Sequence, residues 1–184
     1  NDKDDGLALY DSLLEVGVVP VGIETYANSR RLEKCFRLQG ADLETEYNAI
    51  EAAIQRPLVK EADFHGKFAH MAHRKEDPCA ILCTMILDDL NVSGKTRYPV
   101  GISPIIDPAT GEVPIDSKGR RSYTTGMSYC PSIKKFVVMG YLPKQIAFKG
   151  KSLLIEYFNE DGDGLYPMTV QIVGKGSPVS YTHL

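Results

Sequence analysis

The sequence predicts an α+β protein, in which a mixed α/β segment is followed by a small antiparallel β-barrel. In residues 1–76 of the 184-residue chain, apolar side chains recur every three or four positions, as on one face of a helix. In residues 77–177 the apolar runs are short and separated by Gly, Pro, Asp and Ser turns, a pattern typical of short antiparallel strands. We therefore expect two domains with these bounds.

The first helix is expected around residues 7–14, where Leu and Tyr recur at helical spacing. Asp4 or Asp5 can cap its N-terminus, and Gly17 marks its end. The β-branched residues 18–23 then predict a short extended link.

A second helix is predicted over residues 25–36, whose aromatic and apolar side chains fall on one face. A third is predicted over residues 47–55, and Pro57 limits it because proline cannot continue a helix that it enters from within. A short fourth helix is expected over residues 67–73. The boundary between the two domains is expected within residues 74–78.

The second domain is predicted to hold at least five strands, because β-branched and aromatic runs alternate there with turn residues. Turns are expected at residues 107–111 and 116–119. The predicted strands cover residues 80–87, 121–125, 136–142, 153–158 and 165–173.

The composition narrows the class of protein. The hydrophobic share of 43% and the charged share of 24% are ordinary for a globular protein. A net charge of −3 argues against nucleic-acid and anionic-membrane partners, because both favour a basic surface. No apolar run approaches the roughly 20 residues that a membrane-spanning helix needs. Four cysteines are too few for a disulfide scaffold, so we expect reduced thiols and a cytoplasmic protein.

Both ends of the chain have unusual sequences. The chain starts at Asn1 rather than Met and runs almost directly into a helix, so we expect the natural start to lie upstream. Residues 178–184, Pro-Val-Ser-Tyr-Thr-His-Leu, read like a translated sequencing adapter, and we assign them no function.

Several short phrases follow one another along the chain, and their order is more specific than any one of them. Together they resemble the aminomethyltransferase (glycine-cleavage T-protein) family, above all the form fused behind flavin-dependent dimethylglycine and sarcosine dehydrogenases. The resemblance spans residues 7–177. The phrases are Leu9-Tyr10-Asp11, Arg31-Leu32-Glu33-Lys34, Gly40-Ala41-Asp42-Leu43, Asp63-Phe64-His65-Gly66-Lys67, Thr124-Thr125-Gly126, Pro131-Ser132-Ile133-Lys134-Lys135 and Met139-Gly140-Tyr141-Leu142-Pro143.

The resemblance implies that residues 1–76 are the latter part of a folate-binding domain and residues 77–177 the family's C-terminal barrel. It implies tetrahydrofolate-dependent transfer of an aminomethyl or methyl carbon from a small amine such as dimethylglycine, sarcosine or a glycine-derived aminomethyl group. Tetrahydrofolate and the amine are the expected partners. The family's catalytic aspartate would lie upstream, so the chain alone is expected to be inactive, and a eukaryotic source would place it in the mitochondrial matrix.

Two parent enzymes remain open, a stand-alone T-protein and a flavoprotein carrying FAD in an upstream part. The Arg-Leu-Glu-Lys phrase and the insertion at residues 107–122 favour the flavoprotein. A different class stays open as well, namely a catalytically inactive folate-binding or scaffold protein that keeps the fold, because fold alone does not establish activity.

Glu33 is the first candidate site residue. In the family, the glutamate of the Arg-Leu-Glu phrase holds the pterin ring of folate, and Glu33 matches it. A pterin presents a ring N–H beside an exocyclic amino group, and these parallel donors suit a bidentate carboxylate. The alternative is an ion pair with Arg30 or Arg37, three or four residues away on the same helix.

Lys60 is the second candidate, because the family carries a basic residue shortly before the Asp-Phe-x-Gly turn to meet a folate or substrate carboxylate. A solvated lysine is the alternative. The arginines at 30, 31 and 37 could attract the glutamate tail of folate, or form surface salt bridges.

No metal is predicted, since the histidines and cysteines between residues 65 and 83 match no closed zinc pattern.

Some positions depart from the family pattern. Cys35 stands where glycine is usual, Ala49 and Ala53 replace a proline and a glycine, and Thr125 replaces a serine. Loss of glycine restricts the backbone, so we expect altered geometry near Glu33.

Overall fold

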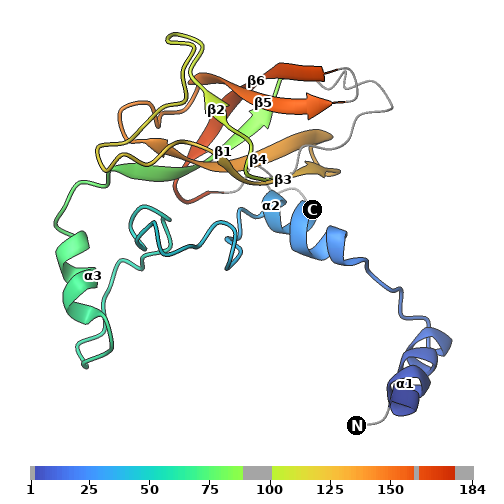
Figure 1. Cartoon of the computed structure of the whole chain (residues 1–184). Helices are drawn as coiled ribbons and strands as arrows, with labels where there is room; N and C mark the ends of the chain where they lie inside the picture. Colours follow the sequence, from blue (N-terminus) through green and yellow to red (C-terminus); the bar gives the residue numbers. More distant parts are fainter. Residues whose placement is uncertain (1–2, 89–100, 160–161, 177–184) are drawn as a thin grey trace.

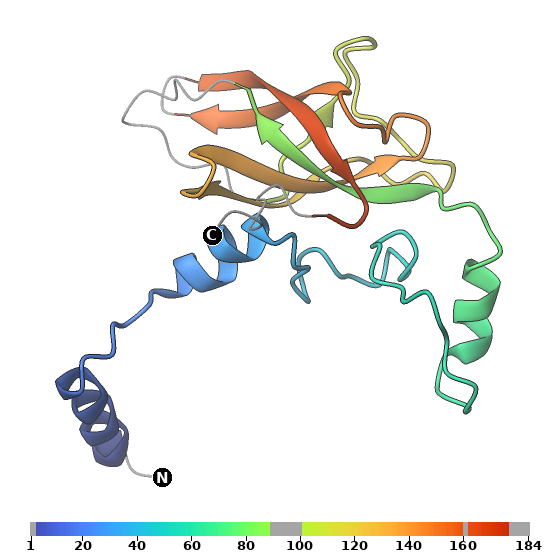
Figure 2. The same cartoon turned by 180° about the vertical axis from the view of Figure 1, so that it is seen from behind.

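The computed structural model describes residues 3–88, 101–159 and 162–176. A curled sheet forms one side of the molecule, and the helices and loops of the first segment lie along its outer face and beyond it (Figures 1 and 2). The helical elements are α1 (Lys3–Glu15), the π-helix η1 (Thr25–Arg30), α2 (Arg31–Glu33) and α3 (Lys67–His73). The strands are β1 (Ala80–Leu87), β2 (Ile105–Ile106), β3 (Thr124–Cys130), β4 (Lys135–Pro143), β5 (Ser152–Asn159) and β6 (Gly162–Val173).

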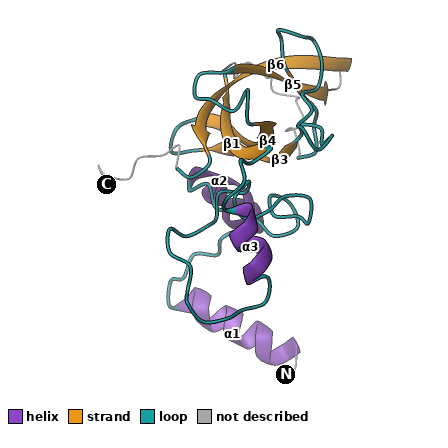
Figure 3. Cartoon of the chain, turned by 90° about the vertical axis from the view of Figure 1, so that its left-hand side faces the viewer, coloured by secondary structure: helices purple, strands orange, loops and turns teal. Residues whose placement is uncertain are grey.

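The six strands form one antiparallel sheet in the order β2-β5-β6-β1-β4-β3. The sheet curls strongly (Figure 3), and an isolated bridge joins Pro104, just before β2, to Tyr123, just before β3. The backbone N–H of Thr124 donates to the carbonyl of Ser103 at 2.9 Å beside that bridge. The predicted mixed fold with an antiparallel sheet is confirmed at this level, while continuous closure into a barrel stays a prediction.

Strand β1 is buried on both of its faces. Cys83, Met85 and Leu87 belong to a core inside the curl, together with side chains of β4, β5 and β6. Ala80 and Leu82 point to a second core on the outer face. This double burial explains why β1 reads as a continuous apolar run, since a strand with one wet face would alternate. The second core also contains Leu32, Tyr47, Ala52, Cys130, Val137, Met139 and Tyr141.

Two of the four predicted helices are confirmed, around residues 7–14 and over residues 67–73. The helix predicted to run to residue 36 ends earlier, because Cys35 adopts a φ of 53°. The helix predicted over residues 47–55 is wrong. Asn48 Oδ1 accepts the N–H groups of Ile50 and Glu51 at 2.9 and 3.0 Å, as at the start of a helix, but the left-handed backbone of Ala53 (φ 54°) ends the segment after a single turn.

The predicted strands agree with the structure better than the predicted helices do. Residues 80–87 are confirmed to the residue, and the last three predicted strands lie within β4, β5 and β6. The strand predicted over residues 121–125 is wrong in its bounds, because pairing with the buried β4 extends β3 as far as Cys130 despite its polar residues. The two-residue strand β2 was not predicted at all.

Helix α1 and the link that follows it stand apart from the sheet in each view of the chain, and no residue of α1 is buried. Gly17 ends the helix with a φ of 84°, as its sequence position predicts. Within the described ranges, no helix has the length and apolar character to cross a membrane. The adapter-like residues 178–184 lie outside the described residues.

Candidate functional site

Glu33 lies at the junction between α2 and the turn that joins β3 to β4. Its side chain is 0% exposed. Oε1 accepts the backbone N–H of Ser132 at 3.0 Å, and Oε2 accepts Nη1 of Arg30 at 2.8 Å. Arg30 also donates to Ser132 Oγ at 3.0 Å. The carboxylate therefore ties the helix to the sheet, and the expected ion pair with Arg30 is present.

The pKa of Glu33 reflects two opposing effects. Burial raises the pKa, but the hydrogen bonds from Ser132 and Arg30 outweigh burial and hold it below its ordinary value. The group is therefore an anionic acceptor at neutral pH, which is the form that a pterin's donors require.

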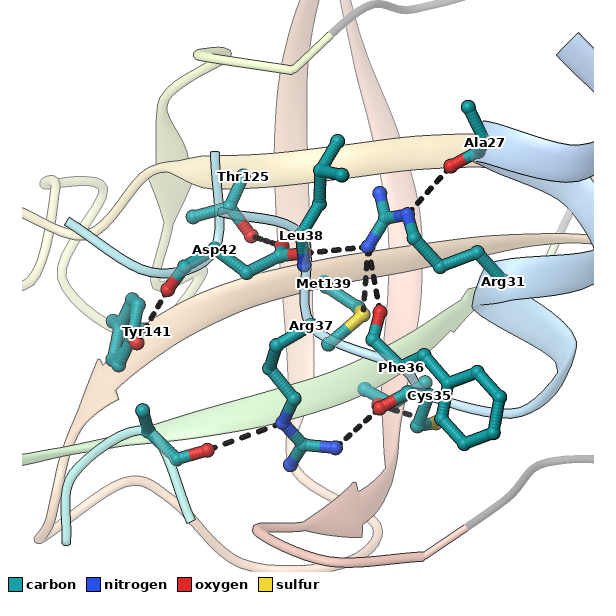
Figure 4. A network of polar contacts seen from close by, with 12 residues as sticks. Ala27, Arg31, Cys35, Phe36, Arg37, Leu38, Asp42, Thr125, Met139 and Tyr141 are labelled. Atoms are coloured by element: carbon teal, nitrogen blue, oxygen red, sulfur yellow. Dashed lines mark hydrogen bonds and ion pairs between the residues drawn. The ribbon is translucent and has the colours of Figure 1, made fainter. Parts of the chain in front are cut away.

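A buried ion pair lies beside Glu33, between Arg31 and Asp42 (Figure 4). Arg31 Nη1 donates to Asp42 Oδ2 at 2.5 Å, and both side chains are at most 8% exposed. Thr125 Oγ1 donates to Asp42 Oδ1, and the Tyr141 hydroxyl donates to the Asp42 carbonyl at 2.7 Å. Four residues of the recognised phrases thus form one network that fastens α2 and the following loop to β3 and β4.

This network was not predicted as a site. Arg31, Asp42, Thr125 and Tyr141 stood in the phrases that carried the resemblance, but their pairing depends on a chain reversal at residues 34–42. The available signal was that each of these four residues stood in one of the phrases that carried the resemblance.

The two positions at which glycine is lost both keep a glycine-like backbone. Cys35 has a φ of 53° and Ala53 a φ of 54°, in the left-handed region that glycine favours. Cys35 is 1% exposed, and its sulfur lies 3.1 Å from Thr84 Oγ1. The expected change of geometry near Glu33 is therefore absent at these two positions, and the conformation is kept at the cost of local strain.

Of the arginine cluster, Arg37 is held by backbone carbonyls. Its Nε donates to Ala52 at 3.1 Å and its Nη2 to Gly174 at 2.8 Å, and a further bond reaches Cys35. Arg37 thus joins three separate segments of the chain.

Lys60 lies apart from Glu33. Its ammonium stands 5.1 Å from the centroid of the Phe64 ring, in a shallow pocket of about 290 Å³ that Gln55, Arg56 and His70 also line. Glu33 is not among the residues that line this pocket. The structure therefore does not bring the two predicted ligands into one site, and their roles toward folate stay predictions.

The largest of the pockets described here lies on the other side of α2, between η1 and β3. It has a volume of about 410 Å³ and is lined by Arg31, Thr125 and Gly126 together with residues of η1. One wall is a π-helix, a distortion that is often found at functional sites. Among the residues that the structure describes, no group of three or more His, Cys, Asp or Glu side chains is placed to hold a metal ion.

No family model matches the chain. Among curated proteins, it is 28% identical to human mitochondrial dimethylglycine dehydrogenase over 91% of this chain and 18% of that protein. The rat protein of the same name is 30% identical over the same shares. An aminomethyltransferase of Francisella tularensis is 28% identical over 80% of this chain and 39% of that protein.

The fold has a solved counterpart in the glycine cleavage system aminomethyltransferase T of Bartonella henselae. The two structures superpose with a TM-score of 0.59 at 20% identity, over 79% of this chain and 36% of the other. The chain spans less than half the length of each of these relatives. Over most of its own length, it is therefore related to the aminomethyltransferases and the dimethylglycine dehydrogenases.

Proposed function

We propose that the chain is the folate-binding part of a larger enzyme that moves a one-carbon unit from a small amine to tetrahydrofolate. The observation that carries this proposal is homology to dimethylglycine dehydrogenases over 91% of the chain. These relatives are several times longer, so the activity of the whole protein is part of the proposal.

Glu33 is the proposed pterin ligand, and its surroundings fit that role. Its buried carboxylate is anionic and accepts donors on both of its oxygens, which is what the paired donors of a pterin edge require. In this structure the Arg30 guanidinium donates to Oε2. Its N–H groups are hydrogen-bond donors, as are the N–H groups at the edge of a pterin. The Arg30 side chain is 55% exposed, so solvent lies beside it and it can turn outward when a pterin enters.

The residues of this chain would contribute binding and orientation. Glu33 would fix the pterin ring, and the buried network of Arg31 and Asp42 would keep α2 in place on the sheet. Positioning of two reactants can supply effective molarities of about 10⁵–10⁸ M. Tetrahydrofolate would accept the carbon, and FAD in an upstream part of a flavoprotein parent would oxidise the amine.

The flavoprotein parent is the proposed form, in line with the dimethylglycine dehydrogenases among the relatives. A complete reading frame with a dinucleotide-binding Gly-x-Gly-x-x-Gly upstream would support it. If the source is eukaryotic, we propose the mitochondrial matrix, because those relatives are named as mitochondrial.

The test is a calorimetric titration of a reduced folate into the full-length protein and its Glu33→Gln variant. Hydrogen bonds to a charged group contribute about 1.5–3 kcal/mol, so the neutral amide should weaken binding about 10- to 150-fold. Glu61→Gln, an exposed glutamate outside this junction, is the matched control and should bind like the parent. Equal affinity of the Glu33→Gln variant and the parent would remove Glu33 from the site, and an absence of folate binding in the parent would refute the function.

A further inference from the structure

The turn between β3 and β4 places Ser132 against the Glu33 carboxylate. Proline fixes φ at Pro131, and Ile133 packs half-buried against the second core, so Ser132 stands between two anchored neighbours. The backbone N–H of Ile133 donates to the Cys130 carbonyl at 3.3 Å, which closes the turn. The backbone of Ser132 is therefore held in position, although the residue itself is exposed.

Two acceptors of Arg30 come from different parts of the chain. Its Nη1 donates to Glu33 Oε2 at 2.8 Å and to Ser132 Oγ at 3.0 Å. Glu33 lies three residues from Arg30, whereas Ser132 lies 102 residues away in the sequence. An exposed ion pair at a spacing of three residues is weak and does little to restrict a long arginine side chain. The second bond, which ends on an anchored turn, holds the guanidinium in one place.

The Ser132 hydroxyl also acts on the charge of Glu33. Burial raises the pKa of Glu33, but the Ser132 N–H, the Arg30 guanidinium and the Ser132 hydroxyl together lower it below its ordinary value. A hydroxyl can accept one hydrogen bond and donate another, so a single Oγ can serve both charged groups. Ser132 thus joins Arg30 and Glu33 in a closed ring of contacts.

We propose that Ser132 is a positioning residue for the folate site, because its hydroxyl holds Arg30 on Oε2 of Glu33 and so limits how readily a pterin reaches that oxygen. This role rests on the proposed function of Glu33. Ser132 acts through Arg30 and need not touch the ligand. The affinity for folate would then be set in part by a turn of the strand-rich segment, and not by α2 alone.

The test is a double-mutant cycle on the full-length protein, in which calorimetry measures the affinity for a reduced folate. Ser132→Ala removes one acceptor of Arg30, so a ligand displaces the guanidinium more easily and should bind about two- to tenfold more tightly. In an Arg30→Ala background the same substitution should change the affinity by no more than about twofold, because the guanidinium is absent. Equal effects in the two backgrounds would overturn the proposal, and so would weaker binding in Ser132→Ala.

Two further variants separate the hydroxyl from the conformation of the turn. Ser132→Thr keeps a hydroxyl and should keep the parent's affinity, and Ser117→Ala, in another exposed turn, should leave it unchanged. Tighter binding in Ser132→Thr, equal to that in Ser132→Ala, would contradict a role of the hydroxyl.

A second measurement needs no folate. Loss of the Ser132 hydroxyl removes one group that lowers the pKa of Glu33, so carbon NMR should show the Glu33 carboxyl titrating at a higher pH in Ser132→Ala than in the parent. Ser132→Thr should titrate like the parent. A Glu33 carboxyl that titrates alike in all three proteins would refute the ring of contacts.

The outcomes distinguish a failure of this role from a failure of the proposed function. An absence of folate binding in the parent would refute the proposed function and leave Ser132 with a structural role only. Folate binding that Glu33→Gln weakens and Ser132→Ala leaves unchanged would keep Glu33 as the ligand and remove Ser132 from the site.

Discussion

Glu33 and Arg30 already satisfy one another, so a ligand for Glu33 must compete with a side chain of the same protein. Oε2 is bound to Arg30 at 2.8 Å, and the Arg30 side chain is 55% exposed while the Glu33 side chain is 0% exposed. In the proposed folate role of Glu33, Arg30 would have to release Oε2 before a ligand donor could bind there. If the arginine only attracted an anionic ligand, its loss would weaken binding of that ligand. The arrangement of Arg30 over Glu33 predicts the opposite effect.

We expect Arg30→Ala to bind a reduced folate more tightly than the parent, by up to about tenfold, because the ligand no longer has to break one charged hydrogen bond. Calorimetry on the full-length protein measures it. Lys34→Ala removes a neighbouring positive charge without uncovering Glu33, and its affinity should be unchanged or lower. If both variants weaken folate equally, the cations attract the ligand and Arg30 does not compete with it.

The backbone at Ala53 predicts a gain in stability from a glycine. A left-handed L-residue costs about 1–2 kcal/mol, and glycine's greater loss of chain entropy costs about 0.5–1 kcal/mol, so Ala53→Gly should stabilise by up to about 1.5 kcal/mol. Urea unfolding followed by circular dichroism measures the free energy. Ala49→Gly, outside the left-handed region, should instead destabilise. A loss of stability in Ala53→Gly would show that the φ of 54° is not strained.

The junction between α2 and the sheet is held by elements that are far apart in the sequence. Arg31 and Asp42 are 11 residues apart, and Thr125 and Tyr141 reach them from β3 and β4. Since both charges are buried, removal of one partner leaves the other charge without compensation. The stability of the junction should thus respond strongly to a single neutral substitution.

Asp42→Asn should destabilise the chain by about 3–5 kcal/mol, because Arg31 stays buried without its counter-charge. Asp77→Asn serves as control, since Asp77 pairs with Lys144 at the surface with side chains 87% and 43% exposed. That exposed pair should contribute no more than about 1 kcal/mol. Equal effects in urea unfolding would show that the buried pair adds no special stability.

Much of the element arrangement could be predicted from the sequence, because local patterns determine it. The apolar runs over β1, β4 and β5 carry their own strand signal, and Gly17 carries a helix stop. The turns at residues 47–53 could not be predicted, because the segment ends at the left-handed backbone of Ala53, and alanine carries no sequence signal for that conformation. Of the candidate site, the Arg-Leu-Glu-Lys phrase around Glu33 could be found in the sequence. The pocket beside Arg31 could not, because it depends on how β3 passes that side chain.

At the scale of the whole molecule, several carboxylates have lowered pKa values and link folding to pH. Burial raises the pKa of Glu51 and of Asp116, but hydrogen bonds involving Arg120 outweigh it and lower both below their ordinary values of 4.5 and 3.8. Arg120 Nη2 lies 2.5 Å from Glu51 Oε1 and 2.7 Å from Asp116 Oδ2. Because protons bind more tightly to the unfolded chain, these groups stabilise the fold above their ordinary pKa values.

We therefore expect the free energy of unfolding to fall as the pH drops through about 4.5 and 3.8, and to keep falling until the folded-state pKa values are passed. Urea midpoints measured from pH 7 to pH 2.5 check it. A Glu51→Gln/Asp116→Asn double variant should be less stable at pH 7 and show a shallower acid dependence. A double variant with the parent's slope would assign the acid sensitivity to other groups.

The double burial of β1 has a further meaning for anyone who wishes to use the strand-rich half as a separate module. Leu82, Val137 and Met139 form an apolar surface on the outer face of the sheet. Leu32, Tyr47 and Ala52 of the first 76 residues pack against this surface. A chain cut between the two segments would expose this apolar surface to water. Polar substitutions on this outer face would be needed before the strand-rich segment could be produced alone, because the exposed apolar surface would favour aggregation.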